Sequence, residues 1–239
     1  MKISIVIPAH NEEKYIEKCL ASIKLQQLPA GVSTEIVVVL NRCTDKTEQI
    51  AREYGAKIVH EDIKNISTIR NAGVEHASGE WVVTIDADSW MSSGVLSQIA
   101  KLACTGLFIG GGVTIRPERY SPGIVASYGV LLIPAAMMGL SFGLYWFRKE
   151  DFLALGGFDT CKHIAEDVDF QCRLKKLGKR EGKKLKIITN EYITTSCRKF
   201  DQFGDWHFLT NFSNPCKVLQ AINGANRELL DKHWYEVDR

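Results

Sequence analysis

Runs of β-branched residues alternate with helical patterns through the first 105 residues, and this alternation limits the fold more than any other feature. Extended apolar runs occur at 2–9, 35–40, 57–59 and 81–85. Amphipathic helices are predicted between these runs, because their apolar residues recur at helical spacing. Strands that alternate with helices are typical of an α/β fold in which a mostly parallel sheet is flanked by helices.

Polar loops follow three of these predicted strands, at 8–13, 41–45 and 86–90. The carboxyl ends of parallel strands meet at one edge of a sheet, where ligands bind. Asp86 and Asp88 close the fourth strand, and alternate residues of an extended chain share a face. Two carboxylates on one face suit Mg²⁺ or Mn²⁺, with phosphate oxygens and water completing the shell. The same residues are also compatible with a simple polar turn.

Composition excludes several classes of protein. The chain has 239 residues, 45% hydrophobic and 24% charged, which is ordinary for a soluble globular protein. A formal charge of +2 argues against a nucleic-acid partner. The seven cysteines form no Cys-x-x-Cys pair, so neither a zinc site nor a disulfide framework is expected. No secretory signal is recognised at the N-terminus. We therefore expect a cytoplasmic protein.

A charge-free segment extends over 123–147 and ends at Arg148-Lys149. Its length would allow a membrane span, but glycines and Pro134 interrupt it, and 144–147 has the pattern of a strand. We expect a buried helix followed by a strand. Peripheral contact of an apolar helix face with the inner face of a membrane stays open as an alternative.

Six short motifs, taken together, resemble glycosyltransferase family 2. In chain order they are Ile7-Pro8-Ala9-His10-Asn11-Glu12-Glu13, Asn41-Arg42-Cys43-Thr44-Asp45-Lys46-Thr47, Arg70-Asn71-Ala72-Gly73, Asp86-Ala87-Asp88, Gly156-Gly157-Phe158-Asp159 and Glu166-Asp167-Val168-Asp169. Each motif is weak alone, but their order is specific for the fold and the broad chemistry.

The resemblance implies a GT-A type, Rossmann-like nucleotide-binding sheet with an acceptor-side C-terminal elaboration. The whole chain, 1–239, is then one domain, with a nucleotide-sugar-binding half over 1–105 and an acceptor half and tail over 106–239. The implied activity is that of an inverting, hexosyltransferase-like glycosyltransferase that depends on Mn²⁺ or Mg²⁺. It would move a sugar from a UDP- or GDP-type donor to a hydroxyl acceptor. A lipid-linked acceptor and a homodimer stay open.

The same resemblance implies a set of site residues. Asp167 is the expected general base, with Glu166 beside it as a second catalytic residue. Asp88 and Asp86, the Asp-x-Asp (DXD) motif, are the expected metal ligands, with His207 as a third. The residues expected to bind the nucleotide sugar are Pro8, Ala9, Glu12, Asn41, Asp45, Arg70, Asp86 and Gly157.

Several of these residues also have purely structural interpretations. Asn41 stands where the family usually has an aspartate, so the preferred nucleotide stays open. Asp45, with Glu48, would form the capping box of a helix. Arg70 could contact the diphosphate, hold the acidic loop, or lie at the surface. Arg198 could close over the diphosphate, but a solvated basic turn is favoured for it.

A second functional hypothesis comes from a different class of protein. The substitution at Asn41 is compatible with a catalytically inactive nucleotide-sugar-binding scaffold or regulatory module. The complete set of Asp86, Asp88, Glu166 and Asp167 opposes it. Metal-dependent turnover that disappears in an Asp88→Asn variant would separate the two hypotheses.

Overall fold

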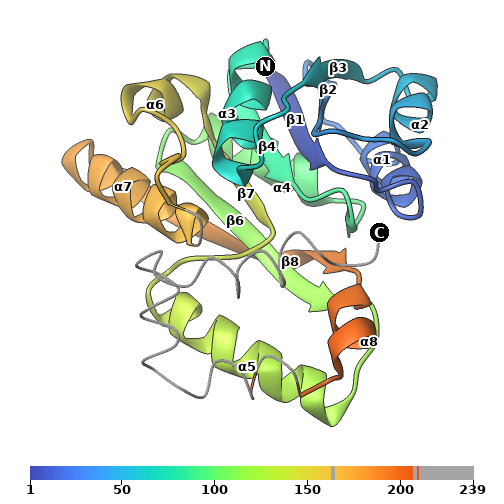
Figure 1. The fold of residues 1–239 in the computed structure, drawn as a ribbon. Helices are drawn as coiled ribbons and strands as arrows, with labels where there is room; N and C mark the ends of the chain where they lie inside the picture. Colours follow the sequence, from blue (N-terminus) through green and yellow to red (C-terminus); the bar gives the residue numbers. More distant parts are fainter. Residues whose placement is uncertain (163–164, 207–208, 210–239) are drawn as a thin grey trace.

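The computed structural model describes residues 1–162, 165–206 and 209, and Figure 1 shows the fold. The strands are β1 (Lys2–Ala9), β2 (Ser33–Leu40), β3 (Lys57–His60), β4 (Trp81–Ile85), β5 (Ser89–Met91), β6 (Phe108–Pro117), β7 (Leu144–Arg148) and β8 (Lys184–Thr195). The helices are α1 (Ile16–Lys24), α2 (Thr47–Glu53), α3 (Ile66–His76), α4 (Val95–Cys104), α5 (Pro122–Met137), α6 (Lys149–Ala154), α7 (Glu166–Arg180) and α8 (Arg198–Phe203). The predicted alternation of strands and helices over the first 105 residues is confirmed.

All of these strands belong to one mixed sheet with the order β3-β2-β1-β4-β7-β6-β8-β5. Four pairs are parallel: β1 with β2, β1 with β4, β2 with β3, and β6 with β8. Strand β7 runs antiparallel to both of its neighbours, and β5 runs antiparallel to β8. The fold is therefore the predicted α/β type, with an antiparallel strand between its two parallel parts.

Helices cover both faces of the sheet, because successive side chains of a buried strand point to opposite faces. On one face Ile3, Ile5 and Ile7 belong to a core cluster that also contains residues of α1, α2 and α4. On the other face Val6 belongs to a second cluster with residues of α3, α6 and α7. The fully apolar sequence of β1 follows from this burial on both sides.

Three successive glycines in β6 allow backbone to approach very closely. A Cβ atom on Gly111 would lie 1.9 Å from the Lys186 carbonyl oxygen, and one on Gly112 would lie 1.6 Å from Ser141 Oγ. The β6–β8 register shifts between Phe108 and Gly110, where Gly110 has φ of 158°. The glycine run therefore accommodates both a register shift and a close approach.

The predictions for the C-terminal half are only partly correct. The last strand, β8, pairs with β6 on one side and β5 on the other. The charge-free segment does form a helix and a strand, α5 and β7. However, α5 is only partly buried: Ile124 is 0% exposed, whereas Ile133 is 63% exposed and Met137 85%. A helix that is apolar all round has no polar side to turn outward, so apolar residues face outward here. No helix within the described ranges has the length and apolar character needed to cross a membrane.

Candidate active site

The Asp86-Ala87-Asp88 turn connects two strands that lie far apart in the order of the sheet. Strand β4 is central and β5 is at the end, although only residues 86–88 separate them in sequence. The sheet must therefore curl to bring β5 beside the carboxyl end of β4. The Asp88 carbonyl oxygen accepts a hydrogen bond from Ser196 N (3.0 Å), just after β8. The end of β8 thus fixes the position of Asp88.

Arg70 connects this turn to the beginning of α7. Its guanidinium donates from Nη2 to Asp86 Oδ1 (2.9 Å) and from Nη1 to Glu166 Oε1 (2.7 Å). The residue is only 6% exposed, so the interpretation as a surface arginine is wrong. Burial alone would lower the pKa of Arg70, but Asp86 and Glu166 raise it above its ordinary value. Arg70 is therefore a fixed cation that brings two separate motifs into one site.

A second arginine, Arg198, has a largely enclosed side chain that lies between Glu12 and Asp88. Its Nη1 and Nη2 donate to the two carboxylate oxygens of Glu12 at 2.7 and 2.9 Å. Nη2 also lies 3.0 Å from Asp88 Oδ2, which accepts a further hydrogen bond from Ser196 Oγ (2.9 Å). The Arg198 side chain is 12% exposed. The favoured interpretation of Arg198 as a solvated basic turn is therefore wrong.

The beginning of α7 presents two carboxyl groups in different surroundings. Glu166 is 8% exposed and bonded to Arg70. Burial and the nearby Asp167 charge raise its pKa to about 7, although Arg70 opposes the shift. Asp167 is only half-buried, and its Oδ2 accepts a hydrogen bond from the hydroxyl of Tyr145, a buried residue of β7. Of the two groups, Asp167 is the one that an incoming molecule can reach.

A tight turn before α7 positions these acids. Asn71, on α3, accepts from Phe158 N and donates to Phe158 O, both at 2.9 Å. Gly157 has φ of 72°, and a Cβ atom there would lie 2.8 Å from Asn71 Oδ1. Its carbonyl accepts from Arg173 Nη2 (2.8 Å) on α7. In this structure Gly157 therefore permits a close backbone approach, and its predicted contact with the nucleotide sugar stays a prediction.

The first two loops are joined to each other by side chains from the predicted set. Asp45 accepts from Glu13 N and Thr47 N, both at 3.0 Å. These bonds, with one from the Thr47 side chain, lower the pKa of Asp45, although burial opposes the shift. Asp45 thus closes the loop, but no capping box forms, because Glu48 pairs with Arg52 instead.

Asn41 is almost fully buried and has protein partners at both ends of its amide. Its Nδ2 donates to the carbonyl of Ile63 (3.0 Å), and its Oδ1 accepts from Arg42 Nη2 (3.2 Å). Its backbone N donates to Ala9 O (2.8 Å), so Pro8 and Ala9, both buried, end beside it. The amide of Asn41 therefore orders the loop edge of the sheet, and contact with a nucleotide base stays a prediction.

The charges at this edge fit a divalent cation. Two guanidinium groups, of Arg70 and Arg198, face five carboxyl groups: Glu12, Asp86, Asp88, Glu166 and Asp167. Negative charge is left over, and the Asp86 side chain is 41% exposed, so its oxygens can reach a ligand. Among the described residues no three or more His, Cys, Asp or Glu side chains are placed to hold a metal ion. A cation here would share its shell with phosphate and water. His207 lies outside the described residues.

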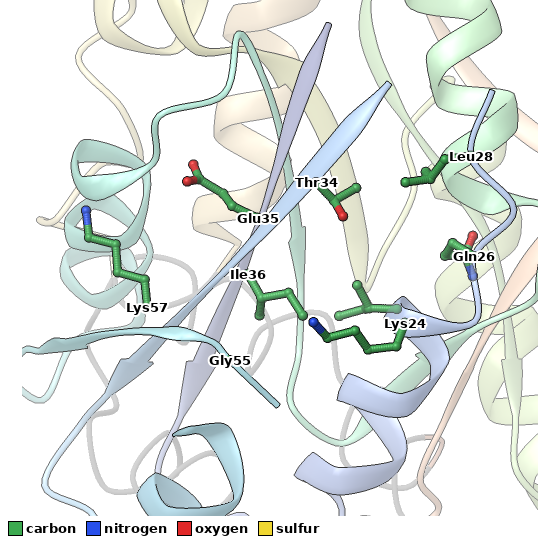
Figure 2. Close-up of a pocket in the computed structure, with 9 residues that line it drawn as sticks. Lys24, Gln26, Leu28, Thr34, Glu35, Ile36, Gly55 and Lys57 are labelled. Carbon is green, nitrogen blue, oxygen red and sulfur yellow. The ribbon is translucent and has the colours of Figure 1, made fainter. Parts of the chain in front are cut away.

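A cavity of about 270 Å³ lies elsewhere in the molecule (Figure 2). Thr34, Glu35 and Ile36 line it from the beginning of β2, whereas Asn41 follows the end of that strand. The cavity is therefore at the opposite end of β2 from the loop edge and contributes nothing to the site.

Sequence reasoning found most of the acidic residues but missed two that hold them. Tyr145 belongs to none of the six motifs, yet its hydroxyl donates a hydrogen bond to Asp167 Oδ2. Ser196 carried no motif, yet it bonds Asp88 through both backbone and side chain. The only sequence feature that could have pointed to either residue is the polar hydroxyl of Tyr145 within an apolar strand. The partners, Asp167 for Tyr145 and Asp88 for Ser196, lie far from them in sequence.

An Asp-x-Asp turn at the loop edge of a curled, mixed sheet, joined by a buried arginine to a second acidic motif, defines a protein of the GT-A fold class. Residues 4–136 match the family model described as Glycosyl transferase family 2. This match covers more than half of the 239 residues. The chain belongs to glycosyl transferase family 2.

The individual relatives share about 30% sequence identity or less with this chain over the matched residues. "Putative glycosyltransferase EpsH" of Bacillus subtilis is 30% identical over 106 residues, which are 42% of this chain and 30% of that protein. A Methanococcus voltae protein, named as a dolichyl N-acetyl-alpha-D-glucosaminyl phosphate 3-beta-D-2,3-diacetamido-2,3-dideoxy-beta-D-glucuronosyltransferase, is 27% identical over 233 residues. That match covers 83% of this chain and 69% of the relative. The matches to EpsH and EpsJ each span only 30% of those proteins.

Solved structures agree on the fold. TarS 1-349 of S. aureus has a TM-score of 0.66 at 20% identity, over 86% of this chain and 63% of TarS. Mannosyltransferase PcManGT from Pyrobaculum calidifontis, solved with GDP-Man and Mn²⁺, has a TM-score of 0.65 at 20% identity. The match covers 93% of this chain and 68% of the PcManGT chain. Neighbouring structures of the same fold thus contain nucleotide sugars and divalent cations.

Proposed function

We propose that this protein transfers a sugar from a nucleotide diphosphate sugar to a hydroxyl acceptor, with inversion, and that it requires Mn²⁺ or Mg²⁺. One observation carries the proposal: buried Arg70 bonds both Asp86 and Glu166, so the Asp-x-Asp turn and Asp167 share one site. A donor held at the first motif would lie next to a carboxylate at the second. Membership of the family supports the same chemistry.

Asp167 is the proposed general base. An acceptor hydroxyl that attacks the anomeric carbon must lose its proton, and a half-buried carboxylate beside the donor can accept it. A single displacement of this kind inverts the configuration and needs no enzyme nucleophile. Tyr145 orients Asp167 through its hydroxyl. Glu166 is a positioning residue in this scheme, because it is buried against Arg70 and faces no open space.

Asp86 and Asp88 would hold the cation, together with the diphosphate of the donor. When bound, the cation stabilises the negative charge that grows on the departing nucleoside diphosphate. Arg198 is a positive group beside Asp88, and its side chain reaches this point from the beginning of α8. In the donor-bound state we expect Arg198 to exchange its carboxylate partners for the diphosphate.

UDP and GDP sugars are the proposed donors, because solved neighbours contain UDP-GlcNAc or GDP-Man. The acceptor proposed here is carried by a lipid. A relative that spans 83% of this chain is named for a dolichyl N-acetyl-alpha-D-glucosaminyl phosphate acceptor, and α5 exposes several large apolar side chains.

The experiment that tests this proposal measures donor binding and turnover separately. A thermal-shift screen of UDP, GDP and their sugars, with and without Mn²⁺, should show a rise in melting temperature for one nucleotide class only with the metal. Release of the nucleoside diphosphate should then depend on Mn²⁺ and disappear in Asp88→Asn. Donor binding without turnover across donors and lipid-linked acceptors would instead identify a nucleotide-sugar-binding module.

A further inference from the structure

Helix α5 presents an apolar surface that no other described element covers. Exposed side chains lie along its length and at its end: Val125 (55%), Val130 (48%), Ile133 (63%), Met137 (85%) and Met138 (51%). The helix carries no charged residue, and its few polar groups turn inward, as Ser127 is 1% exposed. In Figure 1 it lies below the sheet, with α8 against one end. A contiguous apolar surface of this kind marks an interaction site.

Two exposed aromatic residues flank the N-terminal end of this helix. Tyr120 is 67% exposed just before it, and Trp206 is 55% exposed. Trp206 follows Asp205, whose carbonyl accepts a hydrogen bond from Ser127 Oγ (3.3 Å) on α5. Tyrosine and tryptophan favour the interface between water and lipid, because their rings are apolar and their polar atoms stay hydrated.

A basic segment of the chain begins beside the other end of α5, at Lys175, and continues along α7 into β8. The Lys175 ammonium on α7 donates to the Met138 carbonyl (2.6 Å), which places this part of α7 beside the end of α5. The exposed basic residues of the segment are Lys175, Lys176, Lys179, Arg180, Lys184 and Lys186. Glu181 is the only acidic residue between positions 175 and 186. Clustered lysines beside an apolar helix complement anionic lipid headgroups.

The two ends of α5 are attached to the two elements that carry the site. Near its beginning, Tyr128 stacks on Phe200 of α8, with ring centroids 6.1 Å apart, and α8 begins at Arg198. Just after its end, Ser141 N donates to Gln171 Oε1 (2.9 Å) on α7, one turn after Asp167. A membrane or molecule that touches α5 would therefore lie near both α8, which carries Arg198, and α7, which carries Asp167.

We propose that α5 lies in the headgroup region of an anionic membrane, with the basic segment of α7 on the lipid phosphates, and that the acceptor reaches Asp167 from that membrane. The link to the acceptor rests on the proposed function. The membrane surface itself does not, because it depends only on α5, the flanking aromatic residues and the basic segment.

Co-sedimentation of the full chain with lipid vesicles tests the proposal. We expect binding to vesicles of phosphatidylcholine with phosphatidylglycerol, much weaker binding to phosphatidylcholine alone, and release by salt. Ile133→Gln combined with Met137→Gln should reduce the bound fraction about tenfold. The matched control replaces two exposed leucines elsewhere, Leu25→Gln with Leu153→Gln, and should bind normally.

Charge reversal tests the basic segment in the same assay. Lys176→Glu with Lys179→Glu should weaken binding by about tenfold or more, whereas Lys24→Glu with Lys101→Glu should not. Brominated lipids should quench an added tryptophan in Met137→Trp and leave that in Leu153→Trp unaffected. This last result would show that α5 enters the headgroup region.

Equal vesicle binding by the wild type and the α5 double variant would overturn the proposal. So would a change in oligomeric state of that variant without loss of vesicle binding, since α5 would then cover a second copy. Mn²⁺-dependent donor binding is measured on every variant and should stay unchanged. Normal vesicle binding by a protein that binds no donor would overturn the proposed function and leave the membrane surface standing.

Discussion

The Arg198 guanidinium lies 3.0 Å from Asp88 Oδ2, on the carboxylate that is expected to bind a cation. Asp88 and Glu12 raise the pKa of Arg198 above its ordinary value, although burial opposes them. The guanidinium therefore stays charged and offsets part of the negative charge of the carboxylates around it. It must move, or share Asp88, when a cation arrives.

Replacing Arg198 should change metal binding and donor binding in opposite directions. In Arg198→Gln, Mn²⁺ alone should bind about tenfold more tightly, because a competing positive charge is removed. The nucleotide should bind more weakly in the presence of Mn²⁺, because the diphosphate loses a partner. Titration followed by the electron paramagnetic resonance of free Mn²⁺ measures the first effect. Arg119→Gln, which also removes an arginine paired with two carboxylates, is the control. If Arg198→Gln bound Mn²⁺ alone more weakly than the wild type, the proposed exchange of carboxylate partners by Arg198 would be contradicted.

Asp167→Asn should preserve donor binding and abolish transfer. The amide keeps the shape of the side chain but cannot accept the proton of the acceptor, so kcat should fall by about 10²–10⁴. Asp169→Asn, two residues further along α7, is the matched control, because Asp169 pairs with Lys162 and Arg173. Transfer by Asp167→Asn at the wild-type rate would show that another group is the base.

Tyr145→Phe should have a smaller effect of the same kind. Asp167 would lose the hydroxyl that fixes it, and kcat should fall about tenfold, the factor that one ordinary hydrogen bond supplies. The melting temperature and the donor affinity should change little, since the ring remains in place. Tyr54→Phe serves as the comparison. An unchanged kcat would mean that Asp167 needs no support from Tyr145.

Glu166 should make stability decline as the pH rises. Its pKa in the folded protein is about 7, compared with an ordinary value of 4.5, so the folded state holds its proton more tightly. Its contribution to stability is therefore complete below about pH 4.5 and is lost as the pH rises through 7. Glu166→Gln cannot ionise, so its free energy of unfolding should gain about 1–3 kcal/mol relative to wild type over that interval. Urea unfolding without metal measures this, with Glu17→Gln as the control. If the free energies of unfolding of the wild type and Glu166→Gln changed with pH in the same way, the raised pKa of Glu166 would be excluded.

Gly111→Ala should destabilise the sheet severely. The new Cβ atom would lie 1.9 Å from the Lys186 carbonyl oxygen, so β6 and β8 would have to separate. We expect a loss of about 3 kcal/mol or more in urea unfolding. Gly129→Ala is the contrasting variant, because only Ile133 Cδ1 lies near, at 3.9 Å, and the position is helical. That change should raise stability by about 0.5–1 kcal/mol. Similar losses in the free energy of unfolding of Gly111→Ala and Gly129→Ala would contradict the role of close backbone packing between β6 and β8.

The first half of the fold could be predicted from sequence because its signals are local. Strand β1 has the predicted bounds, and an amphipathic helix, α1, follows it as predicted, since both depend on patterns within a few residues. The acidic motifs were found for the same reason. Arg198 could not be placed, because its partner Asp88 is 110 positions away and only the β5–β8 pairing brings them together. The exposure of α5 could not be predicted either, since an apolar sequence does not say what covers it.

The pairing of β5 with β8 has a consequence for how the site comes into being during synthesis. Ser89 faces Thr195, and Ser196 holds Asp88. A nascent chain that has emerged only as far as β7 already contains Asp86 and Arg70, but the anchor of Asp88 has not yet been translated. In the proposed scheme this edge of the sheet therefore closes as a late event, and chains released early by a stalled ribosome would carry Asp86 and Arg70 without the contact that fixes Asp88.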